Sequence, residues 1–149
     1  RTGHAFLKQA LRDTGAVYGG EMSAHHYFRD FMACDSGMIP WLLVAGLMSQ
    51  TGLSLAEMAA TLRRDHPSSG EINFPVTDPA ATVVRVARVL APEARGVDWT
   101  DGLSLDFGDW RANLRASNTE PLLRLNVEAR GDRGLVQAGV SRLQDLITS

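Results

Sequence analysis

The feature that most constrains the fold is a group of three strand-like segments lying between two amphipathic helices. Residues 103–107, 110–115 and 122–129 have the pattern of strands, and helical periodicity marks residues 79–90 and 132–147. A sheet of this kind is stabilised when one of its faces is buried against helices. The second half of the chain is therefore predicted to fold as an α+β domain, with a small antiparallel sheet and two helices packed on one side.

The helix expected at residues 79–90 also indicates which of its faces is buried. Apolar residues recur along it at helical spacing, and one face is expected to carry Val83, Val84, Ala87 and Leu90. A further strand is expected just before this helix, at residues 71–76, where apolar and polar side chains alternate. Both elements belong to the same predicted α+β domain.

The first part of the chain follows a different pattern, in which helices alternate with a strand. Residues 4–13 form an amphipathic stripe, residues 16–20 are expected to form a short strand, and residues 38–50 a long, mostly apolar helix. Asp35 and Ser36 are the expected caps of the long helix. This order is typical of an α/β segment taken from a sheet domain whose other strands lie outside these residues.

A short helix and a polar linker join the two parts. Ser54 and Glu57 form a capping-box pattern at the start of a helix expected over residues 55–64, and a polar run follows it. The predicted organisation has three parts, which are the α/β segment at residues 1–52, the helix and linker at residues 53–69, and the α+β domain at residues 70–149.

The overall composition excludes some classes of partner. With 44% hydrophobic residues the 149-residue chain can bury a core, and its formal net charge of −2 provides no basic field for nucleic acid or an anionic membrane. The longest apolar run, residues 38–48, is interrupted by Pro40 and Gly46 and is too short to span a bilayer. Small molecules are therefore the expected partners, with no nucleic acid and no membrane.

Cys34 is the only cysteine, which rules out an intrachain disulfide and makes the reducing cytoplasm the expected compartment. One cysteine near His25 and His26 does not supply the ligands of a zinc site, so no metal site is expected within these residues. The sequence opens on Arg1, without an initiator methionine, and resembles the inside of a domain. We therefore expect a longer parent chain.

A first polar cluster, residues 19–26 with the sequence GGEMSAHH, directly follows an expected strand. If this segment is extended, Glu21, Ser23 and His25 point to the same side and offer a carboxylate, a hydroxyl and an imidazole to one ligand. Such a set suits a polyol, because two neighbouring hydroxyls can both donate to one carboxylate. The alternative is an ordinary polar turn at the surface.

A second polar cluster, residues 115–121 with the sequence RASNTEP, lies between two expected strands. It offers a planar guanidinium fork and several further donors in a tight bend, a combination that can hold a phosphate. The residues concerned are Arg115, Ser117, Asn118 and Thr119. Glu120 would repel phosphate and is expected instead to orient Arg115 or Arg124. The alternative is a simple turn that closes a hairpin.

Three segments together resemble the α-D-phosphohexomutase family, in particular its bacterial phosphomannomutase/phosphoglucomutase branch. They are RTGHAFLK at residues 1–8, GGEMSAHHYF at 19–28 with DSGMIPWLLVAGLMS at 35–49, and RASNTEPLLRLNVEAR at 115–130. Their order and spacing match the family, and the likeness covers nearly the whole chain. It implies that the α/β segment is the end of the family's third domain and that the α+β domain is its fourth.

The resemblance implies a role for each cluster. Glu21 and Ser23 would hold the sugar hydroxyls at carbons 3 and 4, which have the same stereochemistry in glucose and mannose. His4 and His25 match histidines that are candidates for proton transfer to and from the attacking hydroxyl. The residues matching the loop that holds the phosphate that is not transferred are Arg115, Ser117, Asn118 and Thr119. Ala24 departs from the wider family, where Gly is usual.

The resemblance also implies a reaction. Family members move a phosphoryl group between O1 and O6 of a hexose through a bound hexose 1,6-bisphosphate, and they use an active-site phosphoserine and Mg²⁺. Neither the serine loop nor the acidic metal loop is found in these 149 residues. The intact protein is thus expected to be an isomerase of carbohydrate metabolism acting on phosphosugars, and this chain alone to recognise substrate without turnover.

Two other interpretations stay open from the sequence. One is a stand-alone phosphosugar-binding module without catalysis, which would be tested by looking for a serine loop and a metal loop encoded upstream of Arg1. The other is a fragment of a phosphoglucosamine mutase. That branch usually has Gln where Met22 stands, so Met22 and the DSGMIPW segment favour the mannose/glucose branch.

Overall fold

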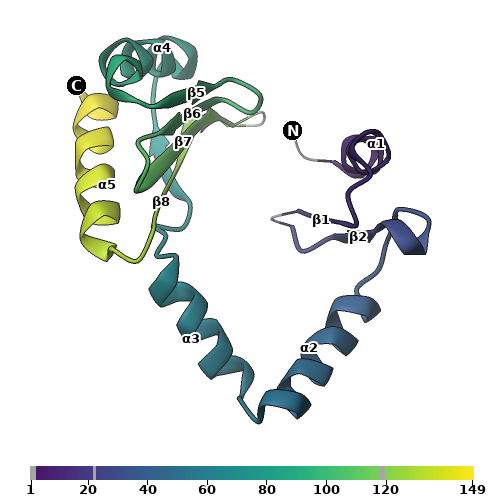
Figure 1. The fold of residues 1–149 in the computed structure, drawn as a ribbon. Coiled ribbons are helices and arrows are strands. Elements are labelled where there is room, and N and C mark those ends of the chain that lie inside the picture. Colours follow the sequence, from purple (N-terminus) through teal and green to yellow (C-terminus); the bar gives the residue numbers. More distant parts are fainter. Residues whose placement is uncertain (1–2, 22, 118–119) are drawn as a thin grey trace. The chain divides into compact units, whose positions relative to one another are not determined.

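The computed structural model describes residues 3–21, 23–117 and 120–149. The chain divides into two compact units, unit 1 (Arg1–Met58) and unit 2 (Ala59–Ser149). They can be followed in Figure 1 by colour, which runs with residue number. Each unit has its own sheet and its own cluster of buried side chains.

Unit 1 contains two helices and a small antiparallel sheet. In chain order its elements are α1 (His4–Thr14), β1 (Tyr18–Gly20), β2 (His26–Phe28), the 3₁₀ turn η1 (Arg29–Phe31), β3 (Cys34–Asp35) and α2 (Met38–Thr51). The strand order is β1-β2-β3 with antiparallel neighbours. The sequence predicts the two helices and β1 but not β2 and β3, which are strands of three and two residues.

The buried cluster of unit 1 is small. It consists of Leu11, Tyr27 and Ala33, with Leu7 and Ala16 partly buried against it. α2 contributes no buried residue, although it is apolar on all sides. An apolar helix of this kind is typical of a buried position in a larger domain.

The ends of α2 lie close to the predicted positions. Gly52, directly after the helix, adopts the left-handed conformation with φ 70° that commonly ends helices. At the other end the N-cap is Gly37, and the predicted cap Ser36 lies one residue earlier, where its Oγ accepts a hydrogen bond from the Ile39 N–H at 3.3 Å. Asp35, the other expected cap, instead accepts from the His26 N–H at 3.0 Å and ties β3 to β2.

α3 (Leu55–Asp65) begins with the predicted capping box. The hydroxyl oxygen of Ser54 accepts from the Glu57 N–H at 3.3 Å, and Glu57 Oε2 accepts from the Ser54 N–H at 2.8 Å. The hydrogen bond from the Ser54 hydroxyl is the main cause that lowers the pKa of Glu57. The units divide within this helix, between residues 58 and 59, and the boundaries predicted at residues 52 and 69 stay a prediction.

Unit 2 is built on a five-stranded antiparallel sheet. In chain order its elements are β4 (Ile72–Pro75), α4 (Pro79–Leu90), the 3₁₀ turn η2 (Ala91–Glu93), β5 (Gly96–Asp98), β6 (Leu103–Asp106), β7 (Trp110–Ala116), β8 (Leu122–Ala129) and α5 (Arg133–Thr148). The strand order is β4-β8-β7-β6-β5. The predicted fold class is therefore confirmed. The sequence does not predict β5, because its three residues are all exposed and show no alternation.

The core of unit 2 lies between one face of the sheet and the two helices α4 and α5. Leu123, Leu125 and Val127 of β8 are fully buried at every second position, as the strand period requires. The expected buried face of α4 needs one correction. Val86 is fully buried, whereas Val84 is 54% exposed, because the helical turn carries it away from the stripe that faces the sheet.

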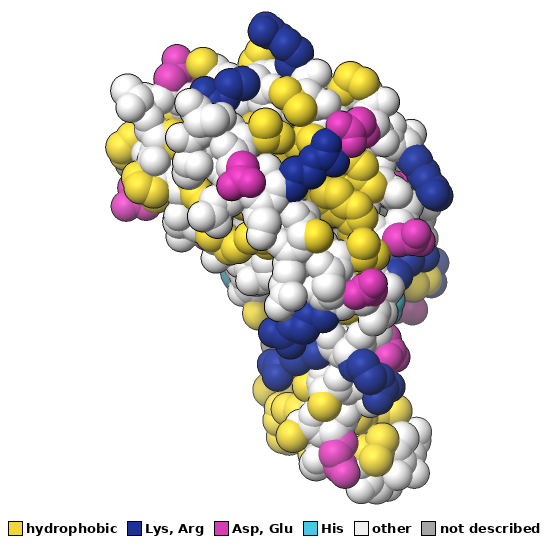
Figure 2. All heavy atoms as spheres, turned by 90° about the vertical axis from the view of Figure 1, so that its left-hand side faces the viewer, with side chains coloured by type: hydrophobic (Ala, Val, Ile, Leu, Met, Phe, Trp, Pro, Cys, Tyr) yellow, Lys and Arg dark blue, Asp and Glu magenta, His cyan; other side chains and the backbone are white. Residues whose placement is uncertain are grey.

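The outer sides of α4 and α5 face solvent. Figure 2 shows this face of unit 2, where charged side chains of both signs are scattered among hydrophobic ones. Arg142 of α5 pairs with Glu93 at 2.6 Å, and the pKa of Glu93 is lowered chiefly by that bond. Arg85 of α4 donates to the carbonyl oxygens of Leu146 and Ile147 at 3.0 and 3.1 Å, which ties the last turn of α5 to α4.

Within the described ranges, no single helix is long and apolar enough to cross a membrane. The two helices α2 and α3 reach that length and apolar content only when they are taken together, and a break separates them.

Candidate functional site

The first polar cluster forms the turn between β1 and β2. The N–H of Glu21 donates to the His25 carbonyl at 2.9 Å, and the N–H of Ala24 donates to the Glu21 carbonyl at 3.0 Å. Ala24 lies in the left-handed region with φ 64°. The segment is thus folded back rather than extended as predicted, and this turn brings Glu21, Ser23 and His25 together. Met22 lies outside the described residues.

The side chains of the turn are joined in one hydrogen-bonded chain. Ser23 Oγ lies 2.8 Å from His25 Nδ1 and 3.3 Å from Glu21 Oε2. The other carboxylate oxygen, Glu21 Oε1, accepts from the Tyr27 hydroxyl at 2.6 Å. The Tyr27 hydrogen bond is the largest cause that lowers the pKa of Glu21, and bonds from Gly3 and Ser23 act in the same direction. Glu21 is therefore ionised and able to accept hydrogen bonds near neutral pH.

The hydrogen bonds among Glu21, Ser23 and His25 indicate which ring nitrogen of His25 carries the proton. Ser23 has a single hydroxyl proton, so it can donate to Glu21 only if it accepts from His25. Both contacts are satisfied together when Nδ1 of His25 carries a proton and donates to Ser23 Oγ. In the neutral imidazole this leaves Nε2 as the basic nitrogen, which can take a proton from a ligand.

His4, the second predicted histidine, is the first residue of α1 and is exposed. The residue before it, Gly3, donates its N–H to Glu21 Oε2 at 3.3 Å, so the start of α1 lies beside the turn. His26, next in sequence to His25, is held differently. Its ring stacks on Tyr18, whose hydroxyl lies 2.7 Å from His26 Nδ1. That contact is separate from the chain through Glu21.

The second polar cluster lies at the tip of the hairpin formed by β7 and β8. The N–H of Ser117 donates to the Leu122 carbonyl at 2.9 Å and closes the loop. Arg115, on β7 just before the loop, is half-buried and pairs with Glu71 at 3.2 Å and with Asp101 at 3.7 Å. The two remaining predicted residues of this loop, Asn118 and Thr119, lie outside the described residues.

Arg124 belongs to the same cluster; the sequence suggested it only as a partner of Glu120 and not as a member of the phosphate site. It lies directly opposite Arg115 in the register of β7 and β8, and its Nη1 is 3.5 Å from Glu71 Oε1. Like charges opposite each other repel, and Glu71 between them offsets that repulsion. The Nε of Arg124 is buried with no hydrogen-bond partner in the described part of the chain. Counting both strands inward from the hairpin would have found this pair.

The carboxylate that orients the arginines also differs from the expectation. Glu120 was expected to orient Arg115 or Arg124, because its carboxylate would repel a phosphate. Among the described residues the carboxylates that pair with them are Glu71 and Asp101. Glu71 precedes β4, which lies beside β8 in the sheet, so sequence distance conceals this contact.

Gly102 allows the turn that follows β5 to lie against Arg115. It adopts φ 74°, and a Cβ atom placed on it would lie 2.6 Å from the Leu114 carbonyl oxygen and 2.7 Å from the Arg115 Cβ. Any side chain at this position would push the strand that carries Arg115. The turn therefore holds Asp101 close to Arg115 only because residue 102 is glycine.

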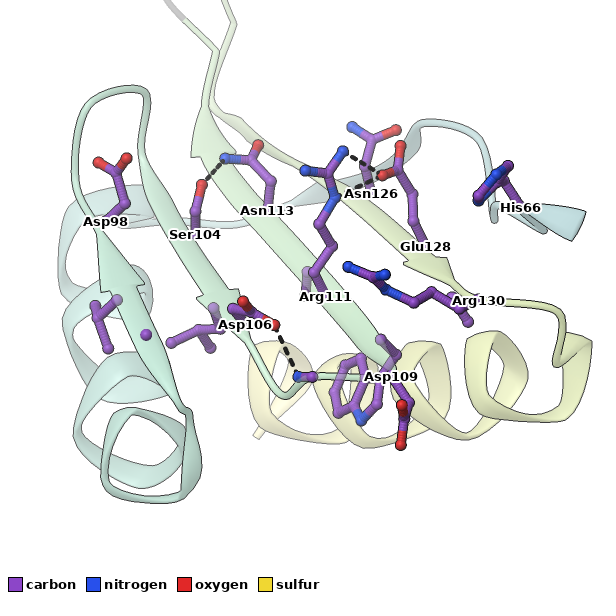
Figure 3. Close-up of a pocket in the computed structure, with 17 residues that line it drawn as sticks. His66, Asp98, Ser104, Asp106, Asp109, Arg111, Asn113, Asn126, Glu128 and Arg130 are labelled. Carbon is purple, nitrogen blue, oxygen red and sulfur yellow. Dashed lines mark hydrogen bonds and ion pairs between the residues drawn. The ribbon is translucent and has the colours of Figure 1, made fainter.

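The same unit carries a hollow of about 950 Å³ on the sheet face away from the helices. Figure 3 shows that polar side chains line it and that several already bond to one another. Asn113 Nδ2 donates to Ser104 Oγ at 2.9 Å, and Arg111 Nε donates to Glu128 Oε2 at 2.7 Å. The hollow contains charged groups of both signs, so it does not select an anion by charge.

The resemblance implies a magnesium ion in the intact protein. In residues 3–21, 23–117 and 120–149, no three His, Cys, Asp or Glu side chains lie together so as to hold a metal ion. These residues do not fit that ion, and no chemical step is assigned to it.

Comparisons with known proteins match both units of the chain to one family. Residues 1–65 match "Phosphoglucomutase/phosphomannomutase, alpha/beta/alpha domain III" and residues 71–145 match "Phosphoglucomutase/phosphomannomutase, C-terminal domain". The polar turn after β1 falls in the first match and the loop after β7 in the second.

Individual relatives agree with this result. A phosphomannomutase of Salmonella montevideo is 56% identical over 149 residues, which are 100% of this chain and 33% of the relative. "Phosphohexose mutases" of Xanthomonas campestris pv. campestris are 55% identical over 147 residues, 99% of this chain and 33% of the relative. A phosphomannomutase of Escherichia coli is 53% identical over 147 residues, 99% of this chain and 32% of the relative. The chain thus spans about a third of the length of these relatives.

A solved structure shows the same fold. The crystal structure of a phosphoglucomutase/phosphomannomutase family protein from Burkholderia thailandensis superimposes with a TM-score of 0.71 at 26% identity, covering 99% of this chain and 32% of that one. Matches in sequence over both units and in structure over nearly the whole chain lead to one conclusion: the chain belongs to the phosphoglucomutase/phosphomannomutase family.

Proposed function

We propose that this chain supplies substrate recognition to a phosphomannomutase/phosphoglucomutase, an isomerase that interconverts hexose 6-phosphates and hexose 1-phosphates through hexose 1,6-bisphosphate. The observation that carries the proposal is that both polar clusters lie in segments matching this family, with their functional groups already joined by hydrogen bonds or ion pairs. The names of relatives from Salmonella and Escherichia coli support the activity.

Glu21 and Ser23 hold the hydroxyls at carbons 3 and 4 of the sugar. An ionised carboxylate accepts from two neighbouring hydroxyls, and Ser23 offers an oxygen beside it. Glucose and mannose differ at carbon 2 and agree at carbons 3 and 4. The same turn can therefore accept both sugars.

His25 is the candidate for proton transfer that the geometry favours. With Nδ1 donating to Ser23, its Nε2 can accept the proton that a sugar hydroxyl loses when it attacks phosphorus, and can return that proton in the reverse step. His4 is a second candidate, supported by its place at the start of α1 next to the residue that binds Glu21.

Arg115 and Arg124 hold the phosphate group that is not transferred, together with Ser117, Asn118 and Thr119 of the loop. Two guanidinium groups side by side can each bond two phosphate oxygens. Glu71 pairs with both arginines, so a phosphate that binds here competes with this carboxylate for their N–H donors. The buried Nε of Arg124 supplies a donor that is not otherwise used within the described residues.

The proposal is tested first on the full-length protein. Supplied with Mg²⁺ and a hexose bisphosphate, it is expected to isomerise mannose 6-phosphate and glucose 6-phosphate, measured by coupled assay or by ³¹P NMR. The 149-residue chain alone is expected to show no turnover. Binding of sugar phosphates by the full-length protein without isomerisation of either would instead identify a binding module, and turnover by the short chain would contradict a role limited to recognition.

The phosphate loop is tested by Arg115→Ala in the full-length protein. Loss of a charged hydrogen-bond donor is expected to weaken binding of mannose 1-phosphate by about 1.5–3 kcal/mol, measured by calorimetry. Arg111→Ala is the matched control, because Arg111 lies on the same strand but pairs with Glu128 instead. Equal affinities for the Arg115 variant and the wild type would reject the phosphate role of this loop.

A further inference from the structure

Tyr27 links the core of unit 1 to the polar turn. Its ring is 1% exposed and lies in the cluster with Leu11 and Ala33. Its hydroxyl leaves that cluster and donates to Glu21 Oε1 at 2.6 Å. A buried phenol needs a hydrogen-bond partner, and an ionised carboxylate is among the strongest that a protein offers. The contact thus serves the stability of Tyr27 and the position of Glu21 at once.

The contacts of Glu21 fall into two classes. Oε1 is held by the short bond from Tyr27, whereas Oε2 has two contacts of 3.3 Å, from the Gly3 N–H and from Ser23 Oγ. Long contacts are the weaker ones and are the first that an incoming hydroxyl can replace. Oε1 is therefore the anchored oxygen, and Oε2 is the oxygen that a ligand can reach.

We propose that Tyr27 is a positioning residue, which fixes the carboxylate of Glu21 through Oε1 so that Oε2 is presented to the sugar hydroxyls. The inference rests on the proposed function, because it assumes that Glu21 binds the sugar. A glutamate side chain on an exposed turn has several rotamers, and holding it in one before the ligand arrives reduces the entropy lost on binding. Tyr27 supplies that restraint from the core, where its side chain is buried.

The protonation states agree with this role. The hydrogen bond to Glu21 raises the pKa of Tyr27 to about 12. The same bond lowers the pKa of Glu21. The charged or titratable groups that act on this pair are His25 on the turn and Asp35 on β3. At neutral pH Tyr27 is then a donor and Glu21 an acceptor, which is the state that sugar hydroxyls require.

The test is Tyr27→Phe in the full-length protein, which removes the hydroxyl and keeps the ring in the core. We expect kcat/KM for mannose 1-phosphate to fall about tenfold, mainly through a higher KM, since one charged hydrogen bond is lost. The acid limb of the kcat/KM profile should also move to higher pH, because Glu21 without this donor takes up a proton more readily. In a Glu21→Ala background, Tyr27→Phe should cause no further loss.

Tyr18→Phe is the matched control. It removes a tyrosine hydroxyl from the neighbouring strand of the same hairpin, where that hydroxyl contacts His26 and not Glu21. Its KM and acid limb should equal those of the wild type. Thermal unfolding of each variant is measured in parallel, so that a loss of fold is seen directly.

The outcomes separate the inference from the function on which it rests. A wild-type protein without mutase activity overturns the proposed function. An active wild type in which Tyr27→Phe leaves KM and the acid limb unchanged overturns the positioning role alone. A fall in kcat/KM that persists in the Glu21→Ala background, or that appears equally in Tyr18→Phe, also overturns it, because the effect then does not pass through Glu21.

Discussion

The two units of this chain bury very different amounts of apolar surface. Among its described residues, unit 1 has a buried hydrophobic cluster of three side chains and an apolar helix, α2, that contributes no buried residue. Unit 2 has a continuous core shared by four strands and two helices. Folding is driven by burial of apolar side chains, so unit 2 carries the elements of an independent domain and unit 1 does not. Both nevertheless hold an organised polar cluster, which shows that local hydrogen bonds order a turn even where the core is small.

The largest expected effect comes from separating the units. Residues 59–149 expressed alone should unfold in one cooperative transition, because the whole core of unit 2 is retained. Residues 1–58 alone should show no such transition and should expose hydrophobic surface. Circular dichroism during heating and binding of a hydrophobic dye measure both properties.

Cooperative unfolding of residues 1–58 would break the contrast between the units. Failure of residues 59–149 to fold would do so as well, and would indicate that unit 2 depends on contacts from outside its own sequence.

A second test places a methyl group in a helix of each unit. Gly139 of α5 faces Trp110, and a Cβ there would lie 2.8 Å from the indole ring and 3.0 Å from Val127. Gly139→Ala should lower the free energy of unfolding by about 1–3 kcal/mol through overpacking. Gly46 of α2 has no such neighbour within 4 Å, so Gly46→Ala should raise helicity and cost no stability.

Urea unfolding and circular dichroism of the 149-residue chain distinguish the two substitutions. Equal effects at both positions would mean that packing around the two helices is alike, contrary to the difference in burial.

The smallest expected effect concerns the surface of unit 2. The pKa of Glu93 is lowered below its ordinary value of 4.5 chiefly by Arg142. A carboxyl group with a lowered folded pKa contributes stability above its ordinary pKa, and loses it as pH falls through the lowered value. Glu93→Gln should therefore flatten the fall of stability below about pH 4.5, followed by thermal unfolding at a series of pH values. If the wild type and Glu93→Gln lose stability in parallel as the pH falls, the pair of Glu93 and Arg142 does not contribute to stability.

How much of the structure could be predicted from the sequence depends on how far apart the interacting residues are along the chain. The capping box of Ser54 and Glu57 is local and is confirmed, and the helix predicted over residues 38–50 is found as Met38–Thr51. At residues 19–26 the sequence left an extended segment and a surface turn open, and the structure has a turn in which Ala24 adopts φ 64°. The pairing of Arg115 with Glu71 spans 44 residues and requires the sheet order to be known.

The candidate site shows the same division. Glu21, Ser23 and His25 are close in sequence, and their proximity was predicted even though the expected backbone conformation was wrong. The contacts of Tyr27 and Arg124 are set by burial and by strand register, and neither the Tyr27–Glu21 bond nor the Arg124–Glu71 pair was expected. The candidate residues that lie close together in sequence could be grouped from the sequence, whereas these two contacts are apparent only in the structure.

Because Glu71 pairs with both Arg115 and Arg124, it reduces the electrostatic attraction of these arginines for an approaching anion. Arg115 and Arg124 carry two positive charges, and Glu71 and Asp101 carry two negative ones, so this group of four is electrically neutral. A neutral group produces little field beyond a few ångströms, and the whole chain has a formal charge of only −2. Under the proposed function, the association rate of a phosphosugar with this loop should therefore depend only weakly on ionic strength.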